Sequence, residues 1–107
     1  MSSTVFGVAY DAAAAAVAAR FWAAALGRTV VEAAAVASSG PRLAFHKVPE
    51  GKTVKNRVHF DLITADFDRE LDRLVRLGAT KLHEIDAGAH WVTLADPEGN
   101  EFDLIKG

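Results

Sequence analysis

The chain has 107 residues, of which 50% are hydrophobic and 24% charged, so its length and composition predict one globular domain, residues 1–107, and exclude a disordered or collagen-like chain. Cysteine is absent, which excludes disulfides, thiolate zinc sites and a cysteine nucleophile, and is compatible with a reducing, cytoplasmic location. The formal net charge of −2 provides no basic field for a phosphate backbone, so we expect no nucleic-acid partner.

The first predicted elements are a strand and a helix. Residues 4–10 form a short apolar, partly β-branched run, which is typical of a strand. Residues 12–26 are Ala-rich, with large side chains recurring on one face, and predict a helix that ends at Gly27. This run is shorter than the ~20 residues of a membrane span, Arg20 interrupts it and no basic segment precedes it, so we expect no signal peptide and no membrane anchor.

A hairpin and a linker complete the first half. Residues 29–37 and 42–48 flank a turn signal at residues 38–41, which predicts two strands joined as a β-hairpin. Residues 49–56 are polar and contain both Pro and Gly, so they form the plausible linker. The first module therefore covers about residues 1–48.

The pattern then restarts in a second module, about residues 57–107. Its helix spaces large apolar residues for one buried face, which includes Val75 and Leu77. Gly78 follows this helix as Gly27 follows the first one. The expected elements are a strand, a helix and three further strands at residues 57–64, 67–77, 80–85, 90–94 and 101–105, with a tight turn at residues 96–100.

The two halves also match residue by residue. Residues 8–11 correspond to residues 58–61, and residues 26–29 to residues 77–80. Such self-similarity at half the chain length indicates a duplicated unit. Asp11 and Asp61 correspond in this repeat and end the predicted first strands. We expect each to cap the following helix, with a role as an acid-base carboxylate as the alternative.

Three segments, residues 42–50, 54–62 and 94–102, resemble the glyoxalase-like branch of the vicinal oxygen chelate superfamily, and the turn at residues 96–100 is the most specific mark. The resemblance covers nearly the whole chain. It implies an α+β fold of two tandem βαβββ modules whose mixed sheet forms a cup around one pocket. Its members include metal-dependent enzymes and metal-free bleomycin-binding proteins, so the fold leaves the function open.

The resemblance also implies a metal site. Metal-dependent members place ligands on the first and last strands of each module, which here correspond to Ala9, His46, His59 and Asp103. Ala9 cannot bind a metal, but two imidazoles and a carboxylate suit Fe, Mn, Ni, Zn or Co. The alternatives are that His46 lies in solvent, that His59 is a hydrogen-bonded core residue, and that Asp103 pairs with a basic neighbour.

Further candidates surround this set. Glu101 alternates with Asp103 on the last strand, so both side chains share one face, and Glu101 is the candidate catalytic base. We expect a ligand pocket lined by five residues, although aromatic side chains on strands also commonly form the core. These residues are Phe45, Phe60, Asp61, Trp91 and Phe102.

Two functions follow from these candidates. One is the binding of a small molecule in the cup between the modules, without any need for a metal. The other is a divalent-metal-dependent lyase, isomerase or dioxygenase acting on a small oxygen-rich substrate. Ala9 breaks the set of four ligands, which slightly favours the binding protein. Because homodimers are common among relatives of this size, we also expect a homodimer.

Overall fold

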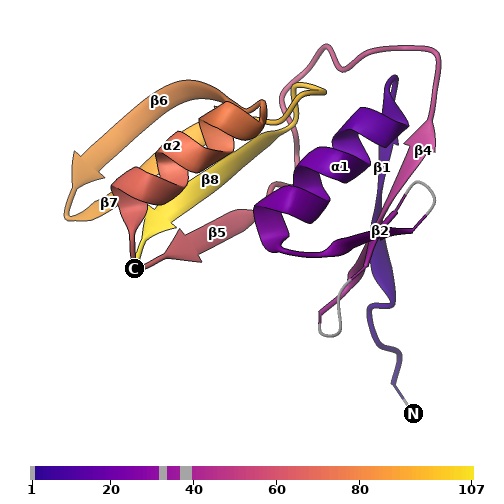
Figure 1. Ribbon diagram of the computed structural model, residues 1–107, viewed down its shortest axis with the longest axis horizontal. Helices are drawn as coiled ribbons and strands as arrows, with labels where there is room; N and C mark the ends of the chain where they lie inside the picture. Colours follow the sequence, from indigo (N-terminus) through magenta and orange to yellow (C-terminus); the bar gives the residue numbers. More distant parts are fainter. Residues whose placement is uncertain (1, 32–33, 37–39) are drawn as a thin grey trace. The chain divides into compact units, whose positions relative to one another are not determined.

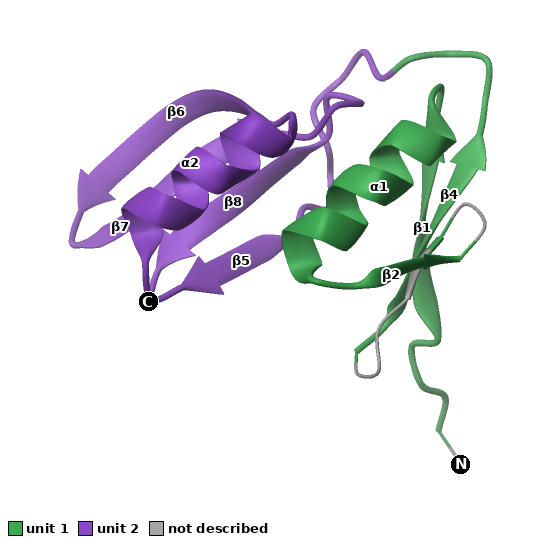
Figure 2. Ribbon diagram, in the orientation of Figure 1, with its two compact units in different colours: residues 1–51 green, residues 52–107 purple. Residues whose placement is uncertain are grey.

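The computed structural model describes residues 2–31, 34–36 and 40–107. The chain folds into two compact units, Met1–Gly51 and Lys52–Gly107, which Figure 2 distinguishes by colour. Each unit contains a strand, a helix and three further strands in that order (Figure 1). The predicted α+β class with two βαβββ modules is therefore confirmed.

The first unit is a four-stranded sheet with one helix packed against it. The strands are ordered β1-β4-β3-β2, with β1 and β4 parallel and the other neighbours antiparallel. Helix α1 contacts β4 in the middle of this sheet. The elements are β1 (Gly7–Ala12), α1 (Ala15–Leu26), β2 (Thr29–Val31), β3 (Ala34–Val36) and β4 (Arg42–Lys47).

Aromatic rings join the helix to this sheet. Tyr10 of β1 stacks against Trp22 of α1 at a centroid distance of 6.4 Å and against Phe45 of β4 at 5.6 Å. The buried helix face is otherwise small, with Ala18 and Ala19 fully covered, so the helix can approach the sheet closely. Alternate residues of β1 and β4 consequently face away from the helix.

Helix α1 begins three residues later than predicted and ends where predicted. Strand β1 extends to Ala12, which pairs with Lys47 of β4, and the backbone can enter the helix only after this pairing ends. Gly27 adopts φ of 65°, the left-handed conformation that glycine tolerates, and the backbone amide of Arg28 donates to the carbonyl of Ala23 at 2.7 Å. The predicted C-cap glycine is thus confirmed.

The two predicted aspartate caps are wrong. Asp11 lies inside β1 in register with His46, and the N-cap position of α1 is Ala14. Asp61 begins β5 (Asp61–Thr64), and Asp66 stands at the N-cap position of α2 without a capping side-chain hydrogen bond. In both units the first strand pairs in parallel with the last, and this pairing holds the aspartate in the sheet.

The hairpin predicted for residues 29–48 contains one strand more than expected. Residues 29–37 supply both β2 and β3, which pair antiparallel, where one strand was predicted. The resemblance had implied this third strand. Ser38 and Ser39 of the predicted turn lie outside the described residues.

The second unit repeats this plan with strand order β5-β8-β7-β6. Strand β5 is shorter than the predicted run 57–64, because its parallel pairing with β8 starts only at Asp61 and Asp103. The remaining predicted elements agree to within two residues. They are α2 (Phe67–Leu77), β6 (Thr80–Ala87), β7 (Ala89–Ala95) and β8 (Glu101–Lys106).

The predicted buried face of α2 is only partly confirmed. Phe67 and Leu74 are buried, whereas Val75 and Leu77 are exposed. Helix α2 contacts β8 and covers one face of the sheet. The buried apolar strand residues of this unit are Val92, Leu94, Phe102 and Leu104.

Hydrogen bonds explain why the tight turn between β7 and β8 has the sequence of residues 96–100. Asp96 is buried, and its Oδ1 accepts hydrogen bonds from the backbone amides of Glu98 at 2.9 Å and Asn100 at 2.8 Å. Its Oδ2 accepts from the Asn100 side-chain amide at 3.3 Å, and Gly99 takes the positive φ of 85° that the turn requires. This motif therefore builds the turn that positions β8.

The described part of the chain contains no helix long and apolar enough to cross a membrane.

Candidate functional site

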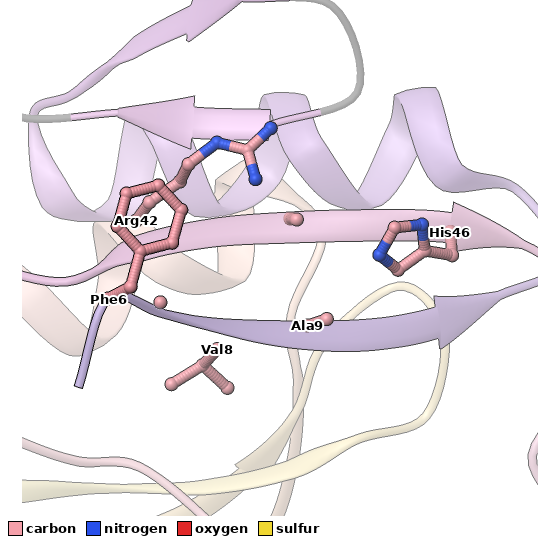
Figure 3. A pocket seen from close by; sticks show the side chains of 7 residues that line it. Phe6, Val8, Ala9, Arg42 and His46 are labelled. Atoms are coloured by element: carbon pink, nitrogen blue, oxygen red, sulfur yellow. The ribbon is translucent and has the colours of Figure 1, made fainter. Parts of the chain in front are cut away.

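The face of the first sheet that α1 leaves open carries a pocket of about 240 Å³. Arg42 and His46 lie on one side of β4, in register with Gly7 and Asp11 of β1, and Ala9 pairs with Ala44 between them. Figure 3 shows Arg42 and Phe6 toward one end of the pocket and His46 toward the other. The lining residues are Phe6, Gly7, Val8, Ala9, Arg42, Ala44 and His46.

Gly7 allows β1 and β4 to approach each other closely at this end of the pocket. A Cβ atom at Gly7 would lie 2.7 Å from the carbonyl oxygen of Arg42, too close for any other residue without movement of the backbone. One residue earlier, the carbonyl of Phe6 accepts a hydrogen bond from the Arg42 backbone amide at 3.3 Å. Phe6 and Arg42 are therefore held beside each other where β1 and β4 begin.

The open face of the second sheet carries a different set of side chains. Asp61 of β5 pairs in register with Asp103 of β8, which pairs with Thr93 of β7, and Thr93 with His83 of β6. The hydroxyl of Thr93 donates to Oδ1 of Asp103 at 2.6 Å. A polar row therefore crosses the whole sheet. Trp91, two residues before Thr93 on β7, lies on this same face and pairs in register with Ile105 of β8.

Two of these side chains, Asp61 and Asp103, meet His59 at the start of β5. Ligand atoms of His59, Asp61 and Asp103 all lie within 4.8 Å of one another. Nδ1 of His59 is 2.9 Å from Oδ1 of Asp61, with these side chains 39% and 53% exposed. One imidazole and two carboxylates, partly open to solvent, are a donor set that fits Mn²⁺, Fe²⁺ or Zn²⁺. The residues present therefore fit a divalent cation, with positions left for substrate oxygens.

This group agrees only in part with the predicted metal site. His59 and Asp103 are brought together as predicted, but the third member is Asp61, a predicted residue of the ligand pocket. His46 belongs to the first unit and lines its pocket. The spacing His59-x-Asp61 is the signal that could have identified Asp61, because residues two apart on an extended segment face the same way.

Glu101 is engaged in an ion pair. Both of its carboxylate oxygens lie 2.8 Å from Nζ of Lys52, and Oε1 also accepts the backbone amide of Asn56 at 2.8 Å. Burial raises the pKa of Glu101, but the hydrogen bonds from Lys52 and Asn56 outweigh it, and the net pKa lies below the ordinary value. These contacts hold the linker segment to β8, which favours a structural role for Glu101.

The predicted pocket residues separate into two environments. Asp61 and Trp91 lie on the open face of the second sheet, whereas Phe45 and Phe102 are buried in the cores of their units and so differ from the prediction. Each phenylalanine lies on the side of its strand opposite the polar residue that follows it, His46 or Asp103. Phe60 precedes β5 and accepts a backbone hydrogen bond from Asp103 at 2.9 Å. Sequence reasoning also missed Arg42 as a pocket residue, although its spacing of four from His46 places both on one face of a strand.

Solved structures share this fold at low sequence identity. The fosfomycin resistance protein FosX from Mesorhizobium loti has 15% identity and a TM-score of 0.77, with 100% of this chain and 94% of that chain covered. A superfamily member from Sphaerobacter thermophilus has 19% identity and a TM-score of 0.72, with 100% and 99% covered. A FosX mutant from Listeria monocytogenes has 11% identity and a TM-score of 0.79, with 98% and 90% covered.

No curated protein matches the chain. The sequence does match a protein family described as a glyoxalase-like domain, and the match runs over residues 7–105. This range contains both units almost entirely, including the pocket of the first unit and the His59, Asp61 and Asp103 group of the second. The chain therefore belongs to the glyoxalase-like domain family.

Proposed function

We propose that this protein binds a small molecule on the open face of its first sheet. The observation that carries the proposal is the pocket in which an arginine, a histidine and a phenylalanine surround a floor of small apolar residues. Ligand sites typically combine an apolar lining with a few polar groups that orient the ligand. At about 240 Å³ the pocket is smaller than the roughly 300–1,000 Å³ of sites for drug-sized ligands, so its ligand is a small metabolite.

The family and its solved structures support this proposal. The FosX mutant from Listeria monocytogenes was crystallised with Mn(II) and 1S,2S-dihydroxypropylphosphonic acid, a molecule of only a few carbon atoms. The shared fold can therefore hold a ligand of the size expected here. At 11% sequence identity, the similarity between this chain and the FosX mutant concerns the fold alone.

Filling the floor of the pocket tests the proposal. We would screen a library of small metabolites by amide chemical shifts of the full chain and compare wild type with Ala9→Leu, whose larger side chain occupies the pocket. We expect ligands that shift the amides of Ala9 and Ala44, and a loss of affinity of about ten-fold or more in A9L. Ala16→Leu on the exposed side of α1 is the matched control and should bind normally.

Two results would contradict small-molecule binding at this pocket. One is a library in which no compound shifts the amides of the open face. The other is a ligand that binds A9L as tightly as the wild type.

A second candidate function is that of a divalent-metal-dependent enzyme, and the group formed by His59, Asp61 and Asp103 favours it. A cation held by these side chains would act as a Lewis acid on a substrate oxygen. Thr93 orients the carboxylate of Asp103 through its 2.6 Å hydrogen bond. The catalytic role of Glu101 stays a prediction. Its carboxylate forms an ion pair with Lys52, and a role as base would require that pair to open.

Titration with Mn²⁺ tests this second function. We expect wild type to bind one Mn²⁺ per chain by calorimetry, and Asp61→Asn and His59→Ala to bind at least ten-fold more weakly, because each loses a ligand. Asp68→Asn, an exposed carboxylate of α2, is the control and should leave the affinity unchanged. Equal Mn²⁺ binding by D61N and the wild type would exclude Asp61 as a ligand.

A further inference from the structure

We propose that the pocket of the first unit selects a small carboxylate with an apolar body, and that Arg42 holds the anionic end. This inference deepens the proposed function and rests on it. The guanidinium of Arg42 offers a planar set of donors that matches the two oxygens of a carboxylate. Ala9 and Ala44 would contact the apolar body, and His46 would meet a polar group at the far end.

The charges around the pocket place the anion at the Arg42 end. The ion pairs that lysine and arginine form within residues 40–107 use Lys52, Arg69, Arg73, Arg76 and Lys81, while Arg42 lines the pocket. At the other end, Asp11 lies in register with His46 on the same face of the sheet. A carboxylate there disfavours a second anion and favours a neutral hydrogen-bonding group. The pocket is therefore electrostatically asymmetric along the strand.

The spacing of these side chains limits the length of the ligand. Arg42 and His46 are four residues apart on β4, which at about 3.3 Å per residue separates their Cα atoms by about 13 Å. The arginine side chain spans part of that distance, so a ligand body of one ring or a short branched chain fits between them. Phe6 lies beside Arg42 and presents an aromatic surface to such a body.

Benzoate and benzamide are the probes that test this inference, because they share a shape and differ in charge. We would titrate each into the full chain and follow the amides of Gly7, Ala9 and Ala44. We expect benzoate to shift these amides and benzamide to bind at least ten-fold more weakly. In Arg42→Gln the affinity for benzoate should fall at least ten-fold, since a charge-assisted hydrogen bond is lost. Arg20→Gln on the exposed side of α1 is the matched control.

His46→Ala checks the direction of binding. Benzoate carries no second polar group, so we expect H46A to weaken its binding less than R42Q does. Equal binding of benzoate and benzamide, or unchanged benzoate affinity in R42Q, overturns the inference, as does a larger loss in H46A than in R42Q. A neutral metabolite that binds in the A9L-sensitive pocket while benzoate does not would overturn the anion specificity and leave small-molecule binding intact.

Discussion

At the level of single residues, Glu101 is the candidate whose surroundings most change its interpretation. Its side chain is 13% exposed and that of Lys52 20% exposed, so their ion pair is shielded from solvent more than a surface pair. Lys52 and Asn56 belong to the linker predicted at residues 49–56, and Glu101 begins β8. The carboxylate thus secures the entry of the chain into the second unit.

This role predicts a pH-dependent contribution to stability. Because the folded-state pKa of Glu101 lies below its ordinary value of 4.5, the ion pair stabilises the fold above that pH and is lost as the pH falls through the folded-state pKa. We expect Glu101→Gln to lower the free energy of unfolding by about 1 kcal/mol at neutral pH, and the difference from wild type to shrink as the pH falls below the ordinary value of 4.5.

Urea unfolding at several pH values measures this difference. Asp72→Asn is a suitable control, since Asp72 and Arg76 form a pair with side chains 72% and 69% exposed and its loss should change stability by less than about 0.5 kcal/mol. A difference between E101Q and wild type that stays constant with pH would show that the ion pair does not contribute as described.

At the level of elements, the turn from Asp96 to Asn100 is a sequence motif that connects β7 to β8. The Asp96 side chain supplies the acceptor for the backbone amides of Glu98 and Asn100 within the turn. Replacing it removes this acceptor in a buried position. We therefore expect Asp96→Ala to lower the free energy of unfolding by about 2–3 kcal/mol, measured by chemical denaturation.

Asp86→Ala is the control for this prediction, since Asp86 is an exposed aspartate on β6 of the same unit and should cost less than about 0.5 kcal/mol. A cost for D96A no larger than that for D86A would mean that the turn forms without the aspartate.

The first strands show why local signals misplace element boundaries. Asp11 is a favoured N-cap type and stands just before an Ala-rich run, so local preference places the start of the helix there. The parallel ladder to β4 instead keeps residues 7–12 extended, because each pair with β4 satisfies backbone groups that a helix start would leave open. A partner strand distant in sequence overrode the local preference.

At the level of the whole molecule, the homodimer stays a prediction, and exposed apolar side chains of the second unit are a candidate surface for it. Ile63, on the open face of β5, is 73% exposed, and Val58 is 75% exposed. Exposed apolar side chains that form a contiguous patch commonly mark an interaction surface. We expect sedimentation velocity at micromolar concentration to show a dimer, which Ile63→Lys should weaken, while Leu82→Lys on the exposed strand β6 serves as a comparison. A wild-type monomer at all concentrations tested would contradict this prediction.

The sequence by itself determined the duplicated plan, both helices, the glycine that ends α1 and the turn before β8. These features depend on local periodicity, on a positive φ or on hydrogen bonds within five residues, all of which are written in short segments. The pattern of residues 29–37 predicts one strand where the structure has two, β2 and β3, and only the family resemblance implied the additional strand.

Only the tertiary structure decided which side chains share a site. Asp61 meets Asp103 because β5 and β8 pair in parallel at that register, and His59 joins them where β5 begins. Arg42 and His46 line one pocket, whereas Phe45 between them is buried, because the side of β4 that α1 covers is set by packing. Register and facing are properties of pairs of distant segments, so no single segment of the sequence could specify them.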